Sequence, residues 1–200
     1  NGSKIEISLG AHQSFILDNI SDGDKNQASL HDGGLQINQP INASNLNLTV
    51  GNVGAFKTNI NNSIFIDIAG SSIETADLTN SGDSSVILKN SGKLLTNLNI
   101  TGLGNLEIIS RINNPNLTID GTNASANVEL SIEGKNMRAL LDRGSDTIRL
   151  NGGNARVDTG RDGDVVSIQG GSQHFIVTGS GSDNVTINSG LNSIDTGADD

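Results

Sequence analysis

The sequence predicts an all-β fold, a right-handed parallel β-solenoid of the β-helix or β-roll type with about 18–24 residues per rung. Three observations predict it. Short segments of alternating apolar and polar residues recur along the chain, turns rich in Gly, Asn, Ser and Asp separate them, and no helical stripe is long enough for a βαβ crossover. With four Phe and no Trp or Tyr, the core must be built from Ile, Leu and Val, which suits thin stacked rungs.

The strands are expected where apolar residues alternate with a period of two. Such segments lie at Ile64–Ile68, Ser85–Leu88, Leu98–Ile100, Leu106–Ile108, Leu117–Ile119, Val128–Ile132, Thr147–Leu150, Val166–Ile168 and Val185–Ile187.

The last third of the chain repeats its turn chemistry at a fixed period, which an antiparallel sandwich of evenly spaced strands does not require. Asp146, Asp164 and Asp183 follow one another at two nearly equal steps. Between them, turns rich in Gly and Asn return at residues 151–153, 170–172 and 188–190. Each repeat is therefore expected to be one rung of two strands and two turns.

The turns that carry these aspartates have the oxygen chemistry of a calcium site. Calcium takes six to eight hard oxygen ligands, and a tight glycine turn can point backbone carbonyls inward while Asp adds a carboxylate. The clearest turn is Thr178-Gly179-Ser180-Gly181-Ser182-Asp183, and shorter or weaker copies surround Asp146, Asp164 and Asp199. The expected metal ligands are Asp142, Gly144, Asp146, Asp158, Gly160, Asp162, Asp164, Gly179, Gly181, Asp183, Asp195, Gly197 and Asp199.

A plainer interpretation is that Asp and Gly are simply good turn formers and that these turns are solvated loops. Repetition in register favours calcium over that interpretation. The alternate turns lack Asp, so calcium is expected along one side of the solenoid only, and the Gly-Gly turns opposite are expected to be structural. The apolar residue two places after each Asp (Ile148, Val166 and Val185) is expected to point into the core.

Upstream of this region the period loosens toward about 20 residues, as from Leu98 to Leu117, and the turns carry Asn and Ser. We expect calcium-poor rungs over residues 1–138 and calcium-binding rungs over residues 139–200, with a soft boundary near Asn136. The chain begins at Asn1 and stops within a repeat, at Asp200. We interpret it as a piece of a longer protein, in which a secretion signal could lie outside this segment.

Two other candidate metal sites are weaker. Asp22-Gly23-Asp24 resembles the opening of an EF-hand loop, but Gln27 stands where that loop needs Gly and Gly33 where it needs Glu. The histidines, His12, His31 and His174, lack metal-ligand spacing and are expected at the surface or its rim.

Composition excludes several function classes. A formal charge of −10 without a cluster of Lys or Arg in the sequence argues against nucleic acid and membrane surfaces as partners and favours cations. No apolar run is long enough to span a bilayer, so no membrane insertion is expected. Cysteine is absent, which excludes disulfides and cysteine chemistry. Neither a G-x-S-x-G elbow nor an H-E-x-x-H motif is present, so we expect no enzyme activity in this segment.

The calcium turns resemble the nonapeptide repeats of RTX proteins, with Thr178 in the first Gly position. The segments Ile73-Glu74-Thr75, Leu95-Thr96-Asn97-Leu98 and Leu117-Thr118-Ile119 resemble the body of Gram-negative surface-layer proteins, in which similar rungs run into RTX-like turns. Together the two resemblances cover about residues 60–200. Typical RTX arrays differ in repeating every nine residues and in loading both sides of the roll.

The resemblance implies a structural protein that is exported by type I secretion to the bacterial cell surface and assembles with copies of itself into a calcium-dependent lattice. A cell-surface polysaccharide is a further partner, expected through a part outside this segment. The alternatives are an RTX adhesin stalk or the non-catalytic calcium-binding block of a secreted toxin or enzyme. An ice-binding function, based on the column Thr159, Thr178 and Thr196, is disfavoured because these residues open turns and no second column accompanies them.

Overall fold

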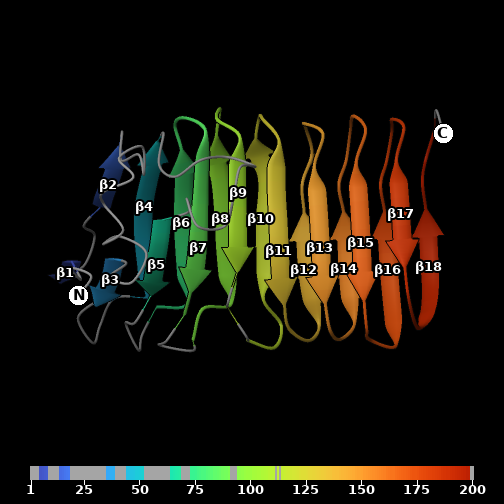
Figure 1. Cartoon of the computed structure of the whole chain (residues 1–200), viewed down its shortest axis with the longest axis horizontal. Helices are drawn as coiled ribbons and strands as arrows, with labels where there is room; N and C mark the ends of the chain where they lie inside the picture. The colour runs from blue at the N-terminus through green and yellow to red at the C-terminus, as the bar shows by residue number, and fades with distance from the viewer. Residues whose placement is uncertain are drawn as a thin grey trace, which may run out of the picture.

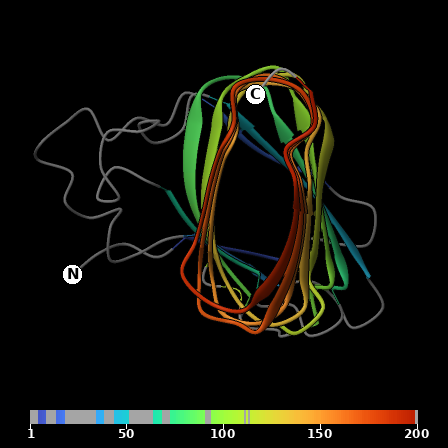
Figure 2. The same cartoon turned by 90° about the vertical axis from the view of Figure 1, so that its right-hand side faces the viewer.

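The computed structural model is a parallel β-solenoid built from two sheets that face each other (Figures 1 and 2). It describes residues 5–8, 14–18, 35–38, 44–51, 64–68, 73–90, 94–110, 112 and 114–198. Each sheet has nine strands, and the chain alternates between the sheets, so every strand pairs in parallel with the strands two places before and after it. The predicted fold class is confirmed.

The first sheet holds the odd-numbered strands and the second the even-numbered ones. The first contains β1 (Ile5–Ser8), β3 (Leu35–Asn38), β5 (Ile64–Ile68), β7 (Ser84–Lys89), β9 (Leu106–Ser110), β11 (Val128–Glu133), β13 (Thr147–Asn151), β15 (Val165–Gln169) and β17 (Asn184–Ile187). The second contains β2 (Ser14–Asp18), β4 (Asn45–Gly51), β6 (Thr75–Asn80), β8 (Asn97–Gly102), β10 (Thr118–Ala124), β12 (Met137–Leu140), β14 (Ala155–Asp158), β16 (Gln173–Val177) and β18 (Leu191–Asp195).

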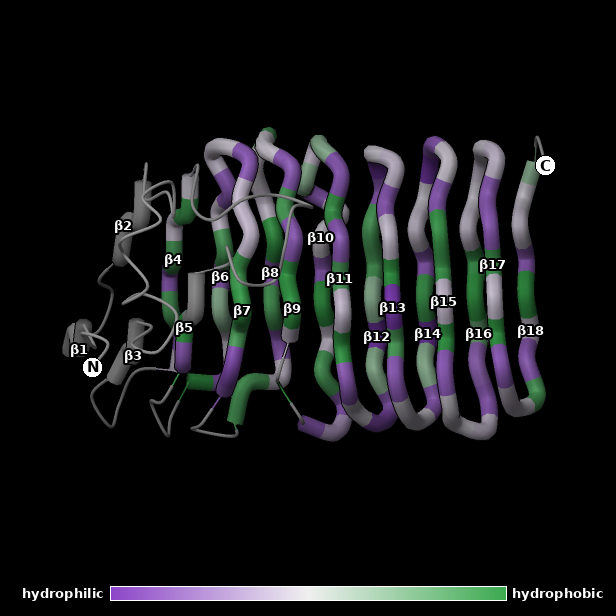
Figure 3. The backbone as a smooth tube through the Cα atoms, in the orientation of Figure 1, coloured by the Kyte–Doolittle hydropathy of each residue, from purple (hydrophilic) through white to green (hydrophobic). Residues whose placement is uncertain are grey.

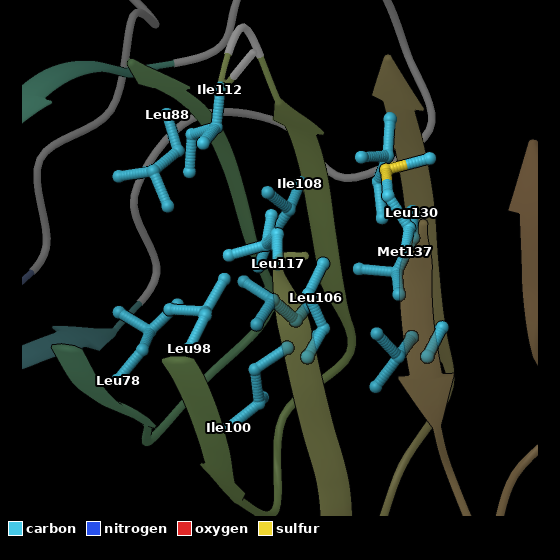
Figure 4. Close-up of a cluster of buried hydrophobic side chains, with 14 of the residues drawn as sticks. Leu78, Leu88, Leu98, Ile100, Leu106, Ile108, Ile112, Leu117, Leu130 and Met137 are labelled. Atoms are coloured by element: carbon cyan, nitrogen blue, oxygen red, sulfur yellow. The ribbon is translucent and has the colours of Figure 1, made fainter. Parts of the chain in front are cut away.

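The core is the aliphatic space between the two sheets. Inward side chains such as Leu98 of β8, Leu106 of β9 and Leu130 of β11 are almost fully buried and come from both sheets (Figure 4). Alternation along each strand sends the intervening polar residues outward, which appears as banding of hydropathy along the strands (Figure 3). One cluster of buried side chains runs from Leu46 to Ile176, so the upstream and downstream rungs share a continuous core.

Rung length falls along the chain. Ile5 pairs with Leu35 and Ser14 with Asn47, so the first rungs are longer than the range expected from the sequence. The step from one rung to the next is shorter where Leu106 pairs with Val128, and shorter again where Glu129 pairs with Thr147. The downstream rungs are therefore the shorter and more regular ones. Leu98 pairs with Ile119, not with Leu117.

One expectation from the sequence is wrong. His174, expected at the surface or its rim, is only 4% exposed because it takes an inward position of β16, where Nε2 lies 3.0 Å from the Gly170 carbonyl oxygen. Two arginines that are far apart in the sequence become neighbours in the fold. Arg138 and Arg156 pair across β12 and β14, because residues a full rung apart become neighbours on one face. Among the described residues, no helix is long and apolar enough to cross a membrane.

Candidate metal-binding turns

The three repeated aspartates form one column at the edge of the core. Asp146, Asp164 and Asp183 each directly precede the first residue of a strand, in the turns that lead into β13, β15 and β17. These turns lie along the upper edge of the solenoid in Figure 1. Because Thr147 pairs with Val165, and Val165 with Asn184, the aspartates stand one above another on consecutive rungs. The structure therefore brings together the residues that set the sequence repeat.

One carboxylate oxygen of each aspartate is used to link rungs. Oδ1 of Asp164 accepts a hydrogen bond of 2.8 Å from the backbone N–H of Asp146, and Oδ1 of Asp183 accepts one of 2.9 Å from the N–H of Asp164. At the start of the column, Oδ1 of Asp146 accepts from the N–H of Val128 at 2.8 Å. The column is thus a ladder in which each side chain binds the backbone of the preceding rung.

The second carboxylate oxygen is buried. Asp146 and Asp164 are each 1% exposed, and their Oδ2 atoms accept no hydrogen bond from any residue that the structure describes. Burial of a carboxylate oxygen without a donor is costly, because water no longer solvates the charge. The turn interior therefore presents carboxylate oxygens that either a proton or a bound cation would stabilise.

Burial raises the pKa values of both carboxyls. Burial raises the pKa of Asp146 from 3.8 to about 8, against the lowering effect of the Val128 N–H, and the charges of Asp164 and Asp162 raise it further. Burial likewise raises the pKa of Asp164 to about 6. The Thr159 hydroxyl, which donates to the Thr178 carbonyl, also lies close enough to the Asp164 carboxylate to lower its pKa somewhat. The charged form of Asp146 is therefore less well stabilised than that of Asp164.

Two threonines line the same turns. Thr159 and Thr178 are fully buried and donate from Oγ1 to the carbonyls of Thr178 and Thr196 on the next rung, at 3.2 and 3.4 Å. Their hydroxyl protons serve to join rungs. Since neither side chain reaches solvent, these two threonines offer no surface for ice, and Thr196, the third of the column, is only partly exposed.

The glycines of these turns permit close stacking of the rungs. Gly160, Gly179 and Gly197 have φ between 80° and 92°, and a Cβ on Gly179 would lie 1.8 Å from the Gly160 carbonyl oxygen. That oxygen accepts from the N–H of Ser180, and the Gly179 oxygen from that of Ala198. Each carbonyl keeps a second lone pair with which it could bind a cation.

Other expected ligands lie outside the buried column. Asp142 is 3.3 Å from Nε of Arg161 and 3.7 Å from Nε of Arg143, so its carboxylate is engaged by two arginines. Asp158 and Asp195 end strands of the second sheet; Asp158 takes an outward position of its strand, and Asp195, which is exposed, aligns with it through Val177.

One further expected ligand, Asp162, lies in the turns themselves. Asp162 is exposed, has φ of 73°, and accepts from the Gly144 N–H at 3.2 Å; it stands in the turn position that Gly144 and Gly181 occupy on neighbouring rungs. Asp199 and the loop at Asp22 and Asp24 lie outside the described residues.

No group of three or more His, Cys, Asp or Glu side chains converges on a point within the described part of the chain. A site here would have to combine a carboxylate or two with backbone carbonyls, as expected for glycine turns.

The upstream part of this column could not be recognised from the sequence. Strand pairing aligns Asp146 with Val128 and Leu106, which are 2% and 1% exposed, and Leu106 in turn with the buried Ser84. The aspartates therefore occupy a core position that the two rungs before them fill with aliphatic side chains. The loss of the apolar residue before the strand at Asp146 is a signal in the sequence, but it can be recognised only once the rungs are aligned.

Comparison with known proteins gives no match: no protein-family model, no curated protein and no solved structure is similar to this chain.

Proposed function

We propose that this chain is a structural segment of a secreted bacterial surface protein, stiffened by calcium bound in the turns at Asp146, Asp164 and Asp183, and that it contributes to a self-assembling surface layer. One observation carries the calcium part: the Oδ2 atoms of Asp146 and Asp164 are buried at a core position, without a hydrogen-bond donor among the described residues. A cation would supply the positive charge that these oxygens lack.

Calcium fits these turns better than a transition metal. The atoms within reach are carboxylate and carbonyl oxygens, which are hard ligands, and the described turns contribute neither thiolate nor imidazole to the column. Glycine turns that expose carbonyls on successive rungs allow one ion to be shared between them. Zinc or copper is therefore disfavoured by ligand chemistry.

The shape and surface of the solenoid support a role in assembly. Stacked rungs with a continuous core make a rigid, elongated body (Figure 1). The outer face of β4, β6, β8 and β10 carries regular polar columns: Asn45, Thr75, Asn97 and Thr118 form one, and Asn47, Asp77, Asn99 and Asp120 the next. Asn99 Nδ2 donates to Asp77 Oδ1 at 2.7 Å, which fixes part of this array. A face with a constant repeat suits lateral contacts between copies.

The experiment is a calcium titration of the wild-type chain, an Asp164→Asn variant and an Asp83→Asn control. Asp83 lies in an upstream turn and accepts from the N–H of Asn105, so the same chemical change is made away from the buried column. Circular dichroism and small-angle scattering report the folding and the size of the particles.

We expect calcium to stabilise wild type and the control, and to stabilise Asp164→Asn much less. An Asp164→Asn response equal to wild type contradicts the calcium turns. If calcium stabilises the full-length parent protein but leaves it a monomeric rod at saturation, the surface-layer role is wrong and an adhesin stalk takes its place.

A further inference from the structure

A hollow of about 640 Å³ lies on the outside of the second sheet, at the beginnings of β12, β14, β16 and β18. Its surface includes Arg138, Arg156, Gln173, Phe175 and Asn192. It is separate from the aspartate turns, because those turns follow the ends of the same strands. The proposed calcium site makes no use of it.

Two like charges face each other in this hollow. Arg138 and Arg156 are directly paired across β12 and β14, and both side chains are exposed. Like charges directly opposite on neighbouring strands destabilise a sheet. Within the described chain, no carboxylate lies within 4.0 Å of either guanidinium, although Asp158 is two residues from Arg156 on the same face. The other three arginines of the downstream rungs each have an acidic partner.

An aromatic ring adjoins the arginine pair. Phe175 stands next to Arg156 in the same column, and the guanidinium carbon of Arg156 lies 4.8 Å from the centre of its ring. Phe175 is 41% exposed, so its ring is open to a ligand from the outer face of the sheet. Stacking holds the guanidinium in place while leaving its N–H edge free to donate to an anion.

Amide side chains border the hollow on the side of the turns. Asn154 Nδ2 donates to Asn136 Oδ1 at 3.3 Å, and Ser172 Oγ donates to Asn154 Oδ1 at 3.0 Å. Hydrogen bonds therefore hold these polar side chains of three successive rungs in a row. Asn192 is held by the carbonyls of Ser189 and Gly190. Such amides provide donors and acceptors at the spacing of the rungs, which can meet hydroxyl groups repeated along a chain.

We propose that this hollow binds a carboxylated glycan: the arginine pair takes a carboxylate, Phe175 packs against the face of a sugar ring, and the amides bind hydroxyls. The arginine fork matches a carboxylate in geometry, and a bound carboxylate relieves the repulsion between the two guanidinium groups. A nucleic acid is disfavoured, because it carries a phosphate on every nucleotide and the chain as a whole has a charge of −10. A glycan with spaced carboxylates meets less repulsion. The site rests on the hollow alone and does not depend on calcium in the aspartate turns.

The test is calorimetric titration with an oligogalacturonate, a neutral oligoglucan of the same length and a single-stranded oligonucleotide, at low and high salt with calcium present. The variants are Arg138→Gln, Arg156→Gln and Phe175→Leu. The control is Arg149→Gln, whose guanidinium pairs with Glu129 on the first sheet.

We expect the oligogalacturonate to bind and each arginine variant to lose about tenfold or more in affinity, as for a hydrogen bond to a charged group. Phe175→Leu should weaken binding of the oligogalacturonate at both salt concentrations, while the control behaves as wild type. Circular dichroism of each variant separates lost binding from lost folding.

Three results overturn the proposal: no binding of the oligogalacturonate by folded wild type, equal binding of the neutral oligoglucan, or tighter binding of the oligonucleotide. Because the readout is glycan binding, these results leave the calcium proposal standing, and loss of the calcium response leaves this one standing.

Discussion

The upstream and downstream turns both link neighbouring rungs through buried polar side chains, but the upstream side chain is a neutral amide and the downstream ones are carboxylates. Upstream, the buried side chain of Asn80 donates from Nδ2 to the carbonyls of Gly104 at 2.7 Å and Asn105 at 3.2 Å, in the turn of the next rung, which leads into Leu106 of β9. Downstream, the aligned position holds Asp146 and Asp164, which bring only acceptors. The upstream turn is closed by the donors of a neutral amide, although the Asn80 Oδ1 atom is itself buried without a hydrogen-bond partner in the described structure, whereas the downstream turn buries carboxylates.

Side-chain ladders show the same contrast. In the upstream column the Oδ1 atoms of Asp83, Asn105 and Asn127 accept from the N–H groups of residues on the following rung, at 2.9, 3.3 and 2.8 Å. In the downstream column each Asp accepts from the preceding rung. Two of the three upstream side chains are neutral amides, so rungs can stack there without an accumulation of charge. The difference teaches that the upstream rungs stack through side chains that are mostly neutral, whereas the downstream rungs stack through a row of buried carboxylates.

The largest expected effect comes from chelation. Removal of calcium should cause residues 139–198 to lose protection from hydrogen exchange while residues 73–110 keep it, because among the turns that the structure describes it is the downstream ones that stack buried carboxylates. Hydrogen-exchange mass spectrometry with EDTA and with excess calcium measures this by region. Equal protection with and without calcium in the downstream rungs would remove the distinction between the two regions.

The next effect separates stacking from metal binding. Gly179→Ala should destabilise the chain by about 3 kcal/mol or more with or without calcium, because φ is 88° and the added Cβ would overlap the Gly160 oxygen. Urea denaturation at saturating calcium and in EDTA checks it. Ser182→Ala, an exposed change in the same turn, serves as the control. A loss seen only with calcium would mean that the glycine acts as a ligand alone.

A pH dependence should distinguish the regions next. The pKa of Asp146 is about 8 in the folded chain and 3.8 as its ordinary value, so the unfolded chain releases this proton first as the pH rises. The free energy of unfolding without calcium should therefore fall between about pH 4 and pH 8, by up to about 1.4 kcal/mol per pH unit for one proton. Asp164, with a pKa of about 6, also lowers the free energy of unfolding as the pH rises from about 4 to about 6.

Calcium should abolish this fall, because the metal replaces the protons, and its apparent affinity should rise over the same pH range. Thermal unfolding from pH 4 to pH 8, with and without calcium, is the measurement. A calcium-free stability that rises with pH would show that these carboxyls are solvated in the folded chain.

The smallest expected effect converts one kind of turn into the other. Asn80→Asp removes the two donors to the carbonyls of Gly104 and Asn105 and buries a carboxylate, so it should cost about 1–3 kcal/mol. The control, Asn97→Asp, makes the same change on the exposed outer face of β8. Denaturation of both variants measures the difference, and an equal cost would mean that the Asn80 amide does not close its turn.

Much of the fold was predictable from local patterns. The strands around Val86, Ile108, Leu130 and Ile148 alternate apolar and polar residues, and the structure confirms each of them. Strands of the second sheet downstream, such as β12 and β14, were not recognised as segments, because they are four residues long and begin with small or flexible side chains. They could be inferred only because each rung needs a second strand, in the opposite sheet, before the chain enters the next rung.

The sequence by itself determined the repeat, the aliphatic core and the spacing of Asp146, Asp164 and Asp183, because periodicity and turn chemistry are local properties. Only the tertiary structure decided which oxygens are buried, since burial depends on the register that aligns Asp146 with Val128 and Leu106. The same register separated Asp142, Asp158 and Asp195 from that column, buried His174, and paired Arg138 with Arg156. Residues a full rung apart become neighbours only when the strands pair, so the charges that face one another cannot be read from adjacent letters.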